Sequence, residues 1–152
     1  MSLMSPPQQE NPTNLAGLKA RGAKVILYHG VSDGIFSAED TRQWLERVNR
    51  VQGGDGASFA RYFPVPGMNH CSGGPATDQF DLLSPLVDWV ERGVAPDSVK
   101  ASVRCQGNLG GTDPELAKEW SANRSRDLCS YPKVATFTGS GSMEDASNYR
   151  CQ

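Results

Sequence analysis

The apolar residues in the first half of the chain fall into a pattern that predicts alternating strands and helices. Residues 24–29, KVILYH, form a run of apolar and β-prone residues closed by Gly30, which is typical of a strand buried on both faces. Residues 58–63, SFARYF, predict a second strand. Two strands joined by a helix in this length make a βαβ unit with parallel strands and a right-handed crossover.

The segment between these strands has the periodicity of an amphipathic helix over residues 39–51. Ser37, with Asp40 three residues later, resembles a capping box at its start, and the glycine-rich stretch QGGDG suits its end. The apolar residues that share one face of this helix are Trp44, Leu45, Val48 and Val51.

Two further apolar stretches flank this unit. Residues 15–20 predict a short helical or turn approach to the first strand. Residues 79–92 are rich enough in Leu, Val and Trp to predict a helix packed on a sheet. We expect Ser84 to cap the main part of this helix and Gly93 to end it.

The sequence beyond residue 97 has weaker periodicity. It predicts a strand over residues 98–104, a short helix over 114–120 and a strand over 134–138, followed by a polar tail. The expected organisation has three parts, namely a vector-derived or disordered leader (1–14), a βαβα unit (15–97) and a loop-rich C-terminal extension packed on it (98–152).

Composition excludes several classes of function. A chain of 152 residues suits about one domain. A net charge of -2, with no cluster of Lys or Arg, gives no broad attraction to phosphate backbones, so we expect no nucleic acid partner. No run approaches about 18 apolar residues, so we expect no membrane span. A second Met close to the first, in the polar opening MSLMSPPQQENPTN, suggests vector-derived residues before a truncated natural sequence.

The four cysteines indicate the compartment. Cys71, Cys105, Cys129 and Cys151 lack the C-x-x-C spacing of zinc and redox sites. Disulfides, and therefore an exported protein, are favoured over buried free thiols.

Two loops carry the candidate chemistry. The loop GVSDG holds Asp33 and the loop PGMNHC holds His70, and each follows a predicted strand of the parallel pair. Ligands bind at the carboxyl edge of such sheets, so Asp33 and His70 are placed to meet. An aspartate and then a histidine on successive loops is the acid and base half of a Ser-His-Asp triad, in the chain order of α/β-hydrolases. The alternatives are that Asp33 only caps a turn and that His70 is an ordinary surface histidine.

A possible nucleophile lies in the first of these loops. Residues 30–34, GVSDG, match the G-x-S-x-G pattern of a nucleophile elbow around Ser32. An elbow requires a helix that starts directly at the nucleophile, whereas the predicted cap here is Ser37. Ser72 in HCSGG is expected to be a loop serine. Ser32 is therefore disfavoured as a nucleophile, but it remains an alternative.

Three segments carry a resemblance to a known family. They are GVSDGIFSAEDTRQWLERV, RYFPVPGMNHCSGGPATDQFDLLSPLVDWVERGVAP and RSRDLCSYPKVATFTGSGSMEDASNYRC. Together they resemble the C-terminal part of the tannase and feruloyl esterase family of α/β-hydrolases, and NHC-x-GG followed by W-V-E-x-G-x-A-P is the most specific signal. The resemblance covers nearly everything after the leader.

The resemblance implies a role for each candidate residue. Asp33 would be the triad acid, His70 the base, and Cys71 one half of a disulfide whose partner stands beside an upstream nucleophilic serine. Cys129 and Cys151 would form a second disulfide, which leaves Cys105 without an assigned partner. The family's structural calcium would lie in an upstream lid, so no cofactor is expected in this chain.

The resemblance also sets the expected function. The parent would be a secreted or periplasmic serine esterase acting on small aromatic esters, hydroxycinnamoyl or galloyl, and this truncated chain alone would be inactive. Alternatives are a non-catalytic binding domain on an α/β scaffold and a small hydrolase that uses Ser32. An unpaired strand edge would allow chains to pair. The acyl group, the alcohol and the oligomeric state are not predicted.

Overall fold

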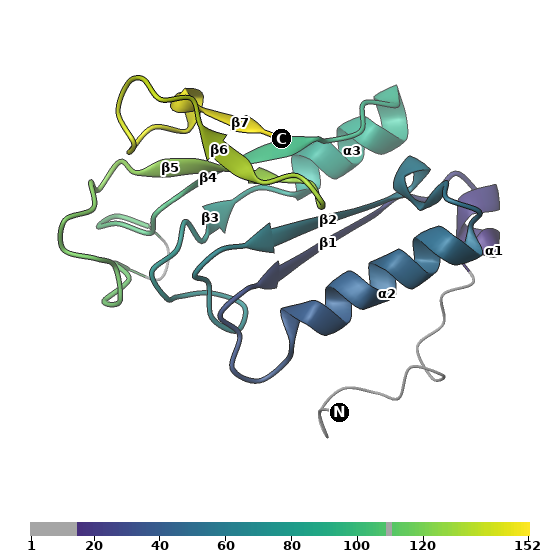
Figure 1. The fold of residues 1–152 in the computed structure, drawn as a ribbon, viewed down its shortest axis with the longest axis horizontal. Helices are drawn as coiled ribbons and strands as arrows, with labels where there is room; N and C mark the ends of the chain where they lie inside the picture. The colour runs from purple at the N-terminus through teal and green to yellow at the C-terminus, as the bar shows by residue number, and fades with distance from the viewer. Residues whose placement is uncertain (1–14, 109–110) are drawn as a thin grey trace.

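The computed structural model describes residues 15–108 and 111–152, so the predicted leader lies outside the described residues (Figure 1). Its helices are α1 (Ala16–Ala20), α2 (Ala38–Val51) and α3 (Leu83–Arg92), with short 3-10 turns at Gly56–Ser58 and Ala146–Asn148. Its strands are β1 (Val25–Gly30), β2 (Ala60–Val65), β3 (Gln79–Phe80), β4 (Ser98–Ser102), β5 (Ser125–Cys129), β6 (Ala135–Phe137) and β7 (Tyr149–Cys151).

The predicted βαβ unit is present. β1 and β2 pair in parallel, from Val25 opposite Ala60 to Gly30 opposite Val65, and α2 lies along one side of them (Figure 1). Ser37 accepts a hydrogen bond from the backbone of Glu39, which confirms the predicted start of the helix. An apolar cluster of Val48, Phe59 and Ala60, with Leu15, Val25, Trp44 and Leu45 around it, joins the helix to the strands.

Two predictions about these strands were wrong. β1 is not buried on both faces, because it pairs only with β2 among the described strands and Tyr28 is 47% exposed. β2 begins two residues later than predicted, since residues 56–58 form a 3-10 turn. β2 is the more buried strand, with Phe63 and Val65 fully buried.

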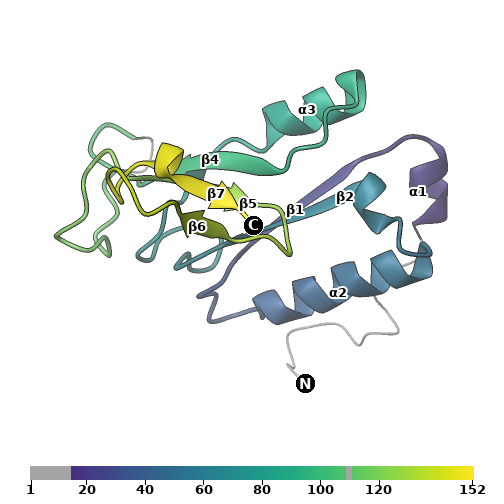
Figure 2. The same ribbon diagram turned by 45° about the horizontal axis from the view of Figure 1, so that its top comes forward.

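The third helix is shorter and more exposed than predicted. Residues 79–80 form β3, and the carboxylate of Asp81, rather than Ser84, accepts hydrogen bonds from the first helical N–H groups. Gly93 ends the helix in the left-handed conformation, as expected. Trp89 is buried, but Leu83, Val87 and Val90 are exposed, so the helix does not lie flat on a sheet. Figure 2 shows α2 and α3 on opposite sides of the strands.

The C-terminal part is richer in strands than the sequence predicts. β3, β4 and β5 form an antiparallel sheet, and β6 pairs with β7. The predicted strands over 98–104 and 134–138 are present as β4 and β6, whereas residues 114–120 form turns instead of a helix. A disulfide between Cys129 and Cys151 joins β5 to β7. The fold is therefore α/β with both parallel and antiparallel strands. Among the described residues, none of the helices has the length and apolar character of a membrane-spanning segment.

Candidate active site

The loops that follow β1 and β2 meet at one edge of the parallel pair. The backbone N–H of Val31 donates to Val65, and that of Ser32 donates to Met68. Gly30 makes this approach possible, because a Cβ built on it would lie 2.3 Å from the carbonyl oxygens of Met68 and Asn69. The sequence at the strand ends therefore fixes how closely the two loops pack.

Asp33 lies at the centre of this edge with its side chain only 3% exposed. Its Oδ1 accepts hydrogen bonds from the backbone N–H groups of Ile35 (2.7 Å) and Phe36 (3.0 Å). Burial alone would raise the pKa of Asp33, but the hydrogen bonds from His70, Phe36 and Ile35 together outweigh burial and hold it well below its usual range. Asp33 is thus a carboxylate, and it can only accept hydrogen bonds.

His70 contacts the other oxygen of this carboxylate. Its Nδ1 lies 2.7 Å from Asp33 Oδ2, so Nδ1 carries the proton and donates it. The side chain is 40% exposed, and its ring stacks obliquely against Phe36 at a centroid distance of 5.3 Å. Within the described residues no hydrogen bond reaches Nε2, which in the neutral ring carries a free lone pair.

His29 is a site residue that the sequence reasoning missed. Its Nε2 lies 3.1 Å from Asp33 Oδ2 and its Nδ1 lies 2.7 Å from Thr41 Oγ1 in α2. The sequence placed His29 at the end of a strand without a chemical role. The available signal was its spacing, four residues before Asp33 across a tight loop.

A second group of missed residues holds the His70 loop from the C-terminal part. Glu115 Oε2 accepts hydrogen bonds from the side chain of Asn69 and from the backbone N–H of Gly74, both at 2.8 Å. At the far end of the loop, the buried carboxylate of Asp78 accepts from the N–H of Gly73 and lies 3.3 Å from Arg104. The base therefore depends on Glu115, which lies more than 40 positions away along the chain.

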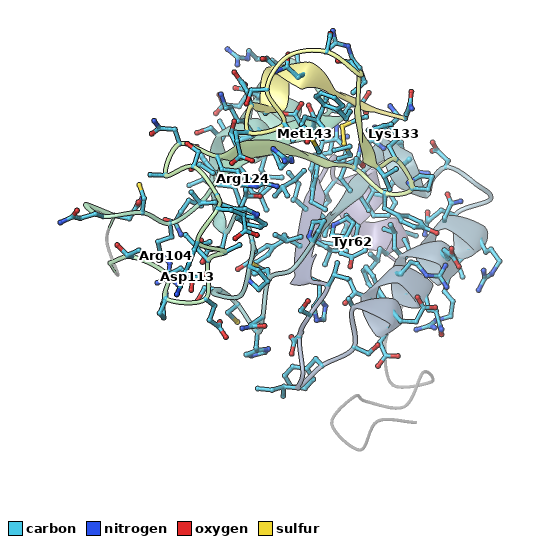
Figure 3. All side chains as sticks on the ribbon, turned by 60° about the vertical axis from the view of Figure 1, so that its left-hand side comes forward. Tyr62, Arg104, Asp113, Arg124, Lys133 and Met143 are labelled. Atoms are coloured by element: carbon cyan, nitrogen blue, oxygen red, sulfur yellow. A yellow bond between two sulfur atoms is a disulfide. The ribbon has the colours of Figure 1, made fainter. Side chains whose placement is uncertain are left out.

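Arg104 joins this loop to a second buried carboxylate. Its guanidinium lies 3.9 Å from Asp113, whose side chain is 1% exposed, and the two residues stand close together in Figure 3. Asp113 in turn accepts a hydrogen bond from the N–H of Glu115. The segment that presents Glu115 is thus itself anchored to Arg104.

A cleft of about 570 Å³ opens over the acid and base. Asp33 and His70 line it together with the rings of Tyr28, Phe36 and Trp44. The hydrogen-bonded acid and base and the aromatic wall therefore face the same space.

The other predicted residues lie as follows. No hydrogen bond joins Ser32 or Ser72 to either histidine in the part of the chain that the structure describes, and α2 starts six residues after Ser32.

Cys71 is an exposed free thiol with a left-handed φ of 66°, a conformation rare for residues other than glycine. The Cys105 thiol is also free and lies 3.4 Å from the side-chain oxygen of Asn108. Within residues 15–108 and 111–152, no group of three or more His, Cys, Asp or Glu could hold a metal ion.

Comparison with known proteins gives a consistent family. A sequence profile described as "Tannase and feruloyl esterase" matches residues 2–152. A mono(2-hydroxyethyl) terephthalate hydrolase from Piscinibacter sakaiensis is 50% identical over 139 residues, which are 91% of this chain and 21% of that protein.

Solved structures agree with the sequence relatives. An esterase from Aspergillus oryzae has a TM-score of 0.74 at 26% identity, and feruloyl esterase B from the same organism has 0.69 at 29% identity. Each match covers 93% of this chain and 29% of the solved chain, so the chain spans between a fifth and a third of the length of these proteins. The chain belongs to the tannase and feruloyl esterase family, whose members are carboxylic ester hydrolases.

Proposed function

We propose that this chain is the C-terminal part of a serine carboxylic ester hydrolase that acts on aromatic esters, with Asp33 as the acid and His70 as the base. The observation that carries the proposal is the 2.7 Å hydrogen bond from His70 Nδ1 to the buried, ionised Asp33. It leaves Nε2 of His70 directed to no protein partner among the described residues, as a general base requires.

The mechanism follows from this tautomer. Nε2 of His70 accepts the proton of a serine hydroxyl as the serine oxygen attacks the ester carbonyl carbon. The tetrahedral intermediate collapses, the bond to the alcohol breaks, and His70 gives its proton to the leaving oxygen. Water then attacks the acyl-enzyme with the same help, which releases the acid and restores the serine. Asp33 stays ionised throughout and stabilises the imidazolium.

The nucleophile, the oxyanion hole and the lid belong to upstream segments in this proposal. The chain covers only 21–29% of the relatives named above, and no hydrogen bond joins Ser32 or Ser72 to a histidine among the described residues. Residues 15–97 then form the end of the catalytic domain and residues 98–152 an extension that holds it. The outer edge of β1 would pair with an upstream strand or, without it, with another chain. The calcium expected from the family would also lie upstream.

Aromatic esters are the proposed substrate class. Tyr28, Phe36 and Trp44 line the cleft beside the acid–base pair and would stack on an aromatic acyl group. The names of two relatives, a terephthalate monoester hydrolase and a feruloyl esterase, refer to esters of aromatic acids.

Export is proposed from the disulfide between Cys129 and Cys151, because such bonds persist in oxidising compartments. Cys71 would pair with a cysteine beside the upstream serine.

A chimera tests this function. The C-terminal segment of the terephthalate monoester hydrolase is replaced by this chain, with His70→Ala and Asp33→Ala variants beside it. We expect the chimera to hydrolyse a chromogenic aryl ester and the variants to lose about 10³-fold or more of kcat. The isolated chain should give only the buffer rate.

Other outcomes would contradict the proposal. A chimera that folds but is inactive would favour the binding-domain alternative. Esterase activity of the isolated chain, with a fluorophosphonate label on Ser32, would favour the small self-sufficient hydrolase.

A further inference from the structure

Asp33 Oδ2 is shared by two imidazole rings. His70 Nδ1 lies 2.7 Å and His29 Nε2 lies 3.1 Å from this one oxygen. These rings belong to the only two histidines in the chain. They differ in setting, because His29 lies at the end of β1 with a side chain 15% exposed, whereas His70 lies on a loop and is 40% exposed.

The negative charge of Asp33 fixes the direction of its hydrogen bonds to the two rings. Asp33 is ionised and can only accept, so both rings must donate to it. His70 then carries its proton on Nδ1 and His29 on Nε2, which are opposite tautomers. In the neutral His29 ring Nδ1 is an acceptor, so the hydroxyl of Thr41 donates to it across 2.7 Å.

The two oxygens of the carboxylate need separate anchors. Oδ1 is held by two backbone N–H groups of its own loop, but a carboxylate held at one oxygen can still pivot about it. His70 is a poor second anchor, because the proposed reaction changes its protonation and its side chain is 40% exposed. His29 is the better anchor, since β1 carries its backbone and Thr41 in α2 fixes its ring.

We propose that His29 is a positioning residue of the hydrolytic site, and that its Nε2–H anchors Asp33 Oδ2 in the orientation that His70 requires. The inference rests on the proposed function for its catalytic consequence, but the hydrogen bond itself does not. His29 completes a set of four donors around Asp33, two for each oxygen. It therefore keeps the acid in place while His70 exchanges protons with substrate and serine.

Ring nitrogen NMR on the histidine-labelled chain tests the hydrogen bond without any activity. The variants His29→Phe and His70→Phe assign the two rings, because no other histidine is present. We expect a His29 ring protonated on Nε2 at neutral to alkaline pH, with an Nε2–H proton that exchanges slowly with water and is lost in Asp33→Ala. A His29 ring protonated on Nδ1, or an Nε2–H that exchanges as in free imidazole, would overturn the proposal.

Kinetics of the active chimera test the catalytic consequence. His29→Gln keeps an N–H donor near the position of Nε2, whereas His29→Phe keeps a ring of similar size without a donor. We expect the Phe variant to lose about 10- to 100-fold in kcat with KM unchanged, and the Gln variant to recover most of that loss. Equal losses in both variants, or a change in KM alone, would contradict a positioning role. If the chimera with His29 intact is inactive, the proposed function fails, and the ring spectra still decide the role of His29.

Discussion

The loops that carry the acid and the base are held in different ways. Asp33 takes three of its four hydrogen bonds from residues 29–36, so its position is set by the local turn between β1 and α2. The His70 loop has internal hydrogen bonds, but it is also held from outside, by Glu115 on Asn69 and Gly74. The acid is thus a product of local sequence and the base of tertiary structure, and each should respond to different substitutions.

Gly30→Ala should give the largest effect, because it separates the two loops. The new Cβ would lie 2.3 Å from two carbonyl oxygens of the His70 loop, and backbone atoms cannot move away as a side chain can. We expect a loss of about 3 kcal/mol in the free energy of unfolding, measured with urea. Gly34→Ala is the matched control, since no atom lies within 4 Å of its Cβ. Equal stability of the two variants would show that the loops are not in close contact.

Glu115→Ala should loosen only the base. It removes the acceptor shared by Asn69 and Gly74, and we expect a loss of about 1 kcal/mol in stability. Amide hydrogen exchange at Gly74 should become faster, while exchange at Ile35 and Phe36 stays unchanged. Glu119→Ala, at an exposed position nearby, is the control. Faster exchange in both loops would mean that acid and base are not held separately.

The dependence of stability on pH tests how the ionised form of Asp33 is held. The pKa of Asp33 is lower in the folded chain than the usual unfolded value of about 3.9, so the unfolded chain binds more protons between the two values. Its contribution is complete above about pH 5 and is lost progressively as the pH falls from about 3.9 towards the lower pKa of the folded chain. We expect stability to fall less steeply below about pH 4 in Asp33→Asn than in the unchanged chain. An unchanged slope in Asp33→Asn would show that the hydrogen bonds to Asp33 do not favour its ionised form.

The same distinction explains how much of the fold could be predicted. The βαβ unit has local signals, namely a β-prone run, the Ser37 cap and one apolar helix face, and these gave the correct parallel pair. The sequences of β5 and β7 carry no such local signals. These two strands are stabilised by pairing with β4 and β6 and by the disulfide between them. The helix predicted over residues 114–120 is absent for a related reason. Asp113 forms an ion pair with Arg104, and Glu115 accepts a hydrogen bond from Asn69 in the His70 loop, so tertiary contacts set the backbone there.

The candidate site divides in the same manner. Asp33 and His70 could be placed together because both follow strands of one parallel pair, whose carboxyl ends share an edge. His29 was missed because a residue inside a strand was considered only for its packing. Glu115 could not be found, since no sequence pattern links it to a loop 41 positions away.

The most direct test of the account is the Nδ1 proton of His70 in the isolated chain. If this chain assembles the acid and base by itself, a downfield ring N–H signal should be seen on His70 Nδ1 and should disappear in Asp33→Ala. If Nδ1 of His70 is unprotonated in the neutral ring and Asp33→Ala changes nothing, Asp33 and His70 are not a preassembled pair, and the proposed role of this chain is wrong.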